Sequence, residues 1–125
     1  MSFLKAHLII FGRVQGVGFR MFTKIKAENL DLSGWVRNLK DGRVEVVLVG
    51  PGEKIEEMLS WLKQGSPLAR VEEVKIEEKK AIKKDPFSGQ FEIRATIWLK
   101  LKAFAMAGEN PEAGKFFSDF LKRLS

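Results

Sequence analysis

The 125-residue sequence contains no cysteine and a single histidine, His7. The chain therefore has no disulfide framework and no thiolate nucleophile, and it offers no cluster of the soft ligands that zinc prefers. Long hydrophobic runs are also missing, because the apolar segment at residues 8–11 has only the length of a strand. We therefore expect a soluble, cytoplasmic protein that does not enter a membrane.

The charged residues are unbalanced toward positive charge. The sequence has 22 lysines and arginines against 16 aspartates and glutamates, which gives a formal net charge of +6. Such a charge attracts anions of any size, from a small phosphate ester to a nucleic acid, and does not choose among them. The chain length is typical of one domain that buries its own core without disulfide or metal cross-links.

Three glycines punctuate residues 12–20, GRVQGVGFR, which follow the apolar run and lead into a helical pattern. Backbone N–H groups in a tight glycine-rich turn converge on one point, and the first turn of the next helix adds unpaired donors. Arg20 supplies a planar fork that matches a phosphoryl group. The segment predicts an anion site, although glycine-rich turns are common and an ordinary structural loop stays open on this pattern alone.

A second segment, GWVRNLKDGRVEV at residues 34–46, is typical of two strands joined by a tight turn at Asp41-Gly42. Together the two segments resemble the acylphosphatase family, and the resemblance extends over about residues 3–95. It implies that Arg20 is catalytic and that Asn38 positions an attacking water. It also implies a phosphate-binding loop made of Gln15, Gly16, Val17, Gly18, Phe19 and Arg20.

The activity implied by the resemblance is hydrolysis of the carboxyl–phosphate bond of acyl phosphates, without a cofactor or a metal ion. A carboxylate leaves without needing a proton, so no general acid is required, and the sequence shows no histidine or paired carboxylates near the two motifs. The alternative function is a non-catalytic phosphate-binding or regulatory module of the same fold. For the single side chains, the alternatives are that Arg20 is a surface arginine at a helix start and that Asn38 only favours the approach to the turn. A nucleic-acid partner is not expected, because residues 44–49 offer no aromatic side chain for stacking bases.

Apolar periodicity predicts an α+β fold of the ferredoxin-like type, an antiparallel sheet with two helices on one face. The expected elements are strands at residues 4–11, 35–39, 43–49 and 71–79 and helices at 21–32 and 53–63, followed by a charged loop at 79–84 and a further strand beginning at 91–93. The first helix should bury Phe22, Ile25 and Leu30, and the second should bury Ile55, Met58, Leu59 and Leu62. Residues 44–49 are apolar on both alternating faces, so we expect the sheet face away from the helices to be covered.

We expect an acylphosphatase-like domain at residues 1–95 and a C-terminal extension at residues 96–125. The segment 91–103 alternates as a strand but also fits a helix at 94–106, and Asn110-Pro111-Glu112 predicts a last helix over 111–124. The aromatic side chains of this extension are too many to leave exposed. They would pack either on the open sheet face near Val47 and Val49 or between two chains, as a homodimer, which we favour because a strand over 91–103 would overhang a compact sheet.

Overall fold

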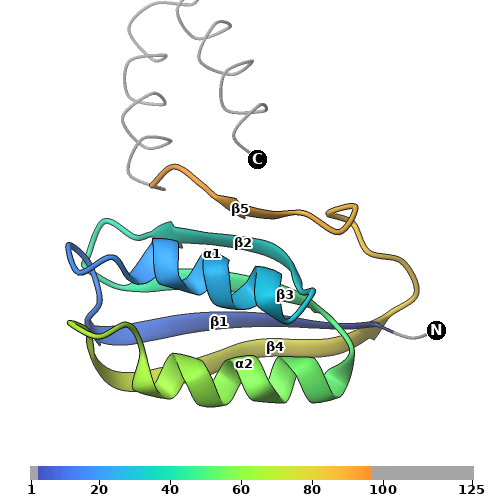
Figure 1. The fold of residues 1–125 in the computed structure, drawn as a ribbon, viewed down its shortest axis with the longest axis horizontal. Helices are drawn as coiled ribbons and strands as arrows, with labels where there is room; N and C mark the ends of the chain where they lie inside the picture. Colours follow the sequence, from blue (N-terminus) through green and yellow to red (C-terminus); the bar gives the residue numbers. More distant parts are fainter. Residues whose placement is uncertain (1–2, 97–125) are drawn as a thin grey trace, which may run out of the picture.

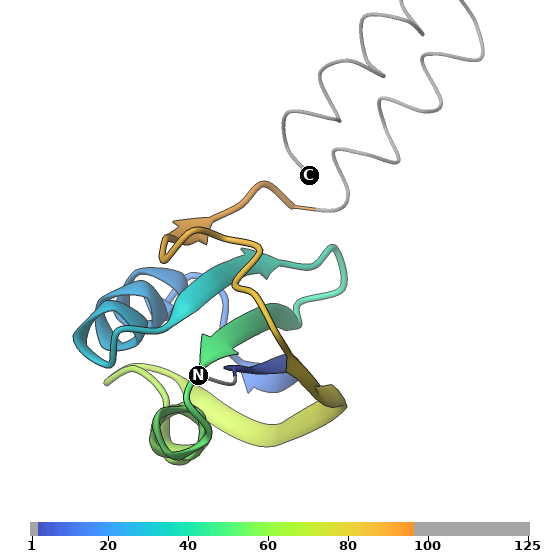
Figure 2. The same ribbon diagram turned by 90° about the vertical axis from the view of Figure 1, so that its right-hand side faces the viewer.

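The computed structural model describes residues 3–96, which form two layers. Both helices cover one face of a five-stranded sheet, as the view along the strands also shows (Figures 1 and 2). The elements in chain order are β1 (Phe3–Arg13), α1 (Phe19–Asn29), β2 (Ser33–Asn38), β3 (Val44–Gly50), α2 (Gly52–Gln64), β4 (Arg70–Ile82) and β5 (Phe91–Ile93). This arrangement confirms the predicted ferredoxin-like fold with two helices on one face and one additional strand.

The strands lie in the order β4-β1-β3-β2-β5, and the pairs β4–β1, β1–β3 and β3–β2 are antiparallel. The prediction that the sheet is antiparallel is wrong for the fifth strand, because β5 runs parallel to β2. The connection after β4 passes around the end of the sheet to the opposite edge before β5 begins (Figure 1). A crossing of this kind brings the new strand in beside β2 in the same direction as β2.

The core lies between the sheet and the helices. On α2 the predicted stripe is confirmed, since Ile55, Met58, Leu59 and Leu62 are all buried. On α1 the predicted stripe is wrong, because the helix buries Phe19, Thr23 and Ala27 and leaves Phe22 and Ile25 exposed, although Leu30 beyond its end is buried. The helix begins at Phe19 rather than at residue 21, and the ring of Phe19 packs 6.2 Å from that of Trp61. Because Phe19 is buried, the buried face of α1 is the one that contains Phe19, Thr23 and Ala27, which are spaced four residues apart.

The predicted charged loop at residues 79–84 is also wrong for most of its length. The strand β4 continues to Ile82 and pairs with β1 as far as Phe3. Since β4 is an edge strand whose side chains are mostly exposed, its lysines and glutamates remain in water while its backbone completes the pairing. The length of β1 therefore decides where β4 ends.

The sheet face away from the helices is partly buried, as its sequence predicts. Val47 and Val49 are buried there, and Trp35 lies beside Val47 in the neighbouring strand. The guanidinium groups of Arg37 and Arg94 lie over the Trp35 ring at 4.7 and 5.1 Å from its centroid. Arginine stems and cation–π contacts thus form part of the cover. The packing predicted for residues 97–125, including the last helix, lies outside the described residues.

Asp85, in the connection between β4 and β5, accepts three hydrogen bonds. The buried Ser33 hydroxyl donates to Asp85 Oδ2, the Phe87 N–H donates to Oδ1 and the Gly89 N–H donates to Oδ2, each at 2.8 Å. Burial raises the pKa of this carboxyl, but the three donated hydrogen bonds outweigh burial, so that its pKa lies below the ordinary value. The ionised carboxylate therefore ties the connection to the start of β2.

We expect Asp85→Asn to lower the free energy of unfolding at neutral pH by about 1–2 kcal/mol, because the amide presents one acceptor oxygen to three donors. The pKa of Asp85 is lower in the folded protein than in the unfolded chain. The ionised carboxylate therefore contributes its full stabilisation at a pH above the unfolded pKa, and this stabilisation is lost as the pH falls through the folded pKa. The difference between wild type and variant should therefore shrink in acid. Urea unfolding over a pH series measures it.

The control for this prediction is Glu57→Gln, which removes an exposed carboxylate from α2. It should change stability little at any pH. A deficit in Asp85→Asn that is as large well below pH 4 as at pH 7 would show that the carboxylate's charge is not what holds the connection.

Candidate active site

Residues 14–18 connect β1 to α1 in a turn that leaves backbone donors unpaired. Gly16 and Gly18 both have a φ of +73°, in the left-handed region that favours glycine. Gly18 is the N-cap residue of α1, and no side chain caps the helix. The first-turn N–H groups are therefore available to an anion, and the positive end of the helix dipole lies beside them.

A pocket of about 220 Å³ opens at this turn. Arg20 and Asn38, the two side chains to which the family resemblance gives a role, both line it, although they come from α1 and β2. Its lining comprises Val14, Gly16, Gly18, Phe19, Arg20, Met21, Asn38 and Ile93. The structure thus brings the two motifs together at one cavity. Met21 and Ile93 are lining residues that the motifs did not indicate.

Arg20 lies in the first turn of α1, where a cation opposes the helix dipole. Among residues 3–96, no carboxylate lies within 4.0 Å of its guanidinium. The unpaired helix donors and Arg20 therefore concentrate positive character at one end of the pocket. A bound phosphoryl group would satisfy both, because its oxygens accept from the backbone and from the guanidinium fork.

Asn38 ends β2, beside the hairpin turn that joins β2 to β3. Its side-chain oxygen Oδ1 is buried and has no hydrogen-bond partner among the described residues. Leaving a buried acceptor unpaired costs about 1–3 kcal/mol, a cost that a donor entering the pocket would remove. The same condition applies to Oγ1 of the buried Thr23, one turn after Phe19 on α1.

Gln15 belongs to the predicted phosphate-binding loop, but its side chain points to the hairpin. Its Nε2 donates to the carbonyl oxygens of Leu39 and Arg43, at 2.7 and 2.9 Å. The side chain therefore holds the turn against the segment that carries Asn38. Sequence reasoning missed this contact because its partners lie 24 and 28 residues away and are backbone atoms, which leave no pattern in the sequence.

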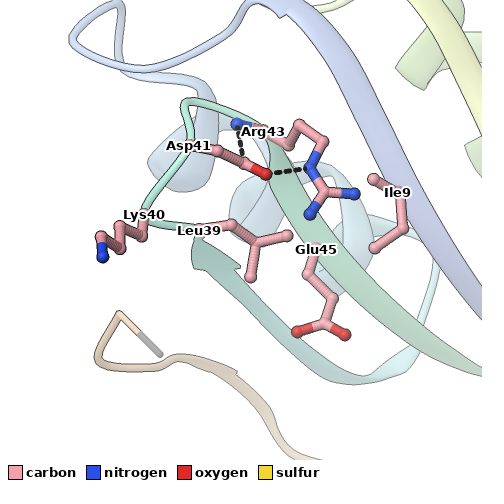
Figure 3. Close-up of a pocket in the computed structure, with 6 residues that line it drawn as sticks. All are labelled: Ile9, Leu39, Lys40, Asp41, Arg43 and Glu45. Atoms are coloured by element: carbon pink, nitrogen blue, oxygen red, sulfur yellow. Dashed lines mark hydrogen bonds and ion pairs between the residues drawn. The ribbon is translucent and has the colours of Figure 1, made fainter. Parts of the chain in front are cut away.

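A larger pocket of about 450 Å³ lies on the other sheet face, beside the hairpin turn (Figure 3). Its lining comprises Ile9, Leu39, Lys40, Asp41, Arg43 and Glu45. Most of its charges are already paired: Arg43 Nε donates to Asp41 at 2.7 Å, which lowers the pKa of that carboxyl, and Glu45 bonds to Arg37 and His7, each at 2.6 Å. We therefore place the chemistry at the smaller pocket, where Arg20 and the helix donors lack partners.

No group of three or more histidine, cysteine, aspartate or glutamate side chains in residues 3–96 is arranged to hold a metal ion. None of the helices in this part of the chain combines the length and the apolar character needed to span a membrane.

The chain is similar in sequence and in fold to known proteins. The family model described as Acylphosphatase matches residues 6–93. An acylphosphatase of Syntrophobacter fumaroxidans is 46% identical over 87 residues, which cover 70% of this chain and 84% of the relative, and one of Thermococcus kodakarensis is 51% identical over 76 residues, which cover 61% and 84%. The solved acylphosphatase of Coxiella burnetii superposes with a TM-score of 0.65 at 38% identity, covering 74% of this chain and 94% of that one.

We expect Gln15→Glu to reduce both stability and turnover, although it preserves the shape of the side chain. A carboxylate cannot donate to the carbonyl oxygens of Leu39 and Arg43, so both hydrogen bonds are lost and the turn separates from the hairpin. The free energy of unfolding should fall by about 1–3 kcal/mol. Urea unfolding and kcat for acetyl phosphate measure the two effects.

Gln90→Glu is the matched control, because it makes the same change at an exposed position in the connection before β5. It should leave both quantities near wild type. If Gln15→Glu behaves like Gln90→Glu, the two hydrogen bonds do not align the site.

Proposed function

The chain belongs to the acylphosphatase family and hydrolyses the carboxyl–phosphate bond of acyl phosphates, and we propose how its own residues carry out this reaction. Gln15, Gly16, Val17, Gly18, Phe19 and Arg20 form the phosphate-binding loop, in which Arg20 is catalytic, and Asn38 orients the attacking water. The observation that carries the proposal is the single pocket lined by both Arg20 and Asn38 beside an uncapped helix N-terminus.

The loop and Arg20 hold the phosphoryl oxygens. Backbone N–H groups of the turn and of the first turn of α1 donate to these oxygens, and the guanidinium fork adds charge-assisted hydrogen bonds. Phosphoryl transfer spreads charge over the three equatorial oxygens, so donors fixed before the reaction stabilise the transition state. The preorganisation comes from Gly16 and Gly18, whose left-handed backbone sets the turn, and from buried Phe19.

Asn38 holds the water in line with the bond that breaks. A water donating to Asn38 Oδ1 would satisfy its unpaired acceptor, and the water's lone pair could then face the phosphorus. The new bond forms between water oxygen and phosphorus as the bond from phosphorus to the acyl oxygen breaks. The electron pair of the breaking bond leaves with the carboxylate, and a proton of the attacking water passes to a phosphate oxygen or to solvent.

The reaction therefore requires neither a cofactor nor a metal ion in this proposal. Arg20 and the helix donors supply the positive character that a metal ion provides in other phosphoryl-transfer enzymes, and the carboxylate leaves without a general acid. The non-catalytic module of the same fold needs no unpaired water acceptor, so Asn38 Oδ1 favours the enzyme.

Two other proposals rest on the sequence. We propose a cytoplasmic location, because the apolar run at residues 8–11 has only the length of a strand. We also propose a homodimer formed through residues 96–125, because the aromatic side chains of this segment require burial.

Arg20→Ala should lose phosphate binding together with turnover, whereas Asn38→Ala should lose turnover while inorganic phosphate still binds. The reason is that the two side chains contact different reactants. Each variant should lose on the order of 3 kcal/mol of transition-state stabilisation, by analogy with removing one preorganised donor. Steady-state hydrolysis of acetyl phosphate and its inhibition by inorganic phosphate measure both effects.

Arg13→Ala is the control, since Arg13 is an exposed arginine at the end of β1 that does not line the pocket. All assays are repeated with a chelator, which should not change the rates. Near-normal turnover in Asn38→Ala would contradict the water-orienting role of Asn38. The metal-free mechanism would be contradicted if a chelator abolished the activity and a divalent ion restored it.

Deletion of residues 97–125 should leave an active monomer, because residues 3–96 already contain a five-stranded sheet, two helices that cover one of its faces and the pocket. Light scattering of the full chain and of the truncated chain gives the number of chains per particle, and acetyl phosphate hydrolysis gives the activity. An unchanged number of chains per particle would exclude these residues from assembly, and an insoluble or inactive truncated chain would show that they complete the core.

A further inference from the structure

The pocket at the turn is closed by buried side chains on its inner side and lined by exposed apolar side chains at its entrance, which we call the mouth. Val14 and Phe19 are each 1% exposed, so they close its inner side. Met21 and Ile93 line the same pocket but are 54% and 38% exposed, so they lie at its outer side. Exposed apolar side chains at a cavity entrance are candidates for contact with the part of a ligand that extends outward.

Ile93 reaches this position because β5 is added to the sheet beside β2. It pairs with Val36, and the Arg94 N–H donates to the Val36 carbonyl oxygen at 2.9 Å. Asn38 follows Val36 by two residues, so it points to the same face of the sheet. The edge strand thus places an apolar side chain on the pocket side of the sheet, where it lines the cavity and stays partly exposed.

The reaction axis directs the acyl group toward this mouth. Displacement at phosphorus requires the water and the leaving group to lie roughly in line on opposite sides. The acceptor proposed to hold the water, Asn38 Oδ1, is buried, which puts the water on the inner side. The acyl group must then leave on the outer side, where Met21 and Ile93 are exposed.

The charges around the mouth favour an uncharged acyl group. Among the described residues that line the pocket, Arg20 is the one ionisable side chain. Its guanidinium is engaged by the phosphoryl group in the proposed complex. Lys24, one turn further along α1, donates to the Phe91 carbonyl oxygen at 3.0 Å and lies 3.7 Å from Glu28. A second carboxylate on the acyl group would therefore find no unpaired cation at the mouth, whereas a hydrocarbon chain would be covered by Met21 and Ile93.

We propose that the enzyme prefers acyl phosphates with short apolar acyl groups, and that Met21 and Ile93 determine this specificity. The proposal rests on the function proposed above, because the direction of the acyl group follows from the role of Asn38. A methylene that becomes fully covered at the mouth would raise kcat/KM about fourfold, and a partly covered one about twofold.

The experiment compares acetyl, propionyl and butyryl phosphates, whose carboxylate leaving groups have nearly the same basicity, with succinyl phosphate as the charged probe. The proteins are the full-length wild type, Ile93→Ser and Met21→Ser. The matched control is Ile76→Ser, which makes the same change at a 47% exposed isoleucine of β4, at the opposite edge of the sheet. The measured quantity is the change in kcat/KM per added methylene, and inhibition by inorganic phosphate reports on the loop alone.

We expect kcat/KM to rise about two- to fourfold per methylene in wild type and Ile76→Ser, and the rise to flatten in at least one of the two mouth variants. A flat series in wild type, a rise that survives in both mouth variants, or faster turnover of succinyl than of butyryl phosphate overturns the proposal. In those cases acetyl phosphate hydrolysis still depends on Arg20. If Arg20→Ala hydrolyses acetyl phosphate normally, the proposed function itself is wrong.

Discussion

The burial of Phe19 is the constraint on which the rest of the site depends. Its ring packs against Trp61 and the core, so α1 must begin at that residue, directly after the left-handed Gly18. A helix that starts there exposes its first N–H groups to the pocket and puts Arg20 beside them. The same packing turns Phe22 and Ile25 outward, so the core determines the proposed anion site and also exposes apolar side chains on α1.

The site combines satisfied and unsatisfied polar groups in a consistent way. Gln15 bonds twice to the hairpin, which fixes the turn relative to Asn38. By contrast, Arg20 forms no ion pair among the described residues, and Asn38 Oδ1 has no hydrogen-bond partner there. Unpaired buried groups lower stability, and they persist where the surrounding packing holds them and a ligand completes them. The larger pocket on the other face shows the opposite pattern, since the partners of Asp41 and Glu45 are already within the chain.

Much of the fold and the two motifs could be predicted from the sequence, because hydrophobic periodicity and glycine-rich turns are local signals. The order of strands and helices and the stripe of α2 followed from such patterns. The face of α1, the extension of β4 to Ile82 and the parallel β5 did not, because each is decided by a distant partner: Trp61, the length of β1 and the edge of β2. The contacts of Gln15 and the placement of Ile93 were inaccessible for the same reason.

The central claim is that the water held by Asn38 attacks phosphorus while the loop and Arg20 hold the phosphoryl oxygens. Hydrolysis of acetyl phosphate in water enriched in heavy oxygen, with analysis of both products by mass spectrometry, tests it most directly. Attack at phosphorus puts the label from water into phosphate and leaves acetate with its original oxygens. Label in acetate would place the attack at the carbonyl carbon and would contradict the assigned geometry.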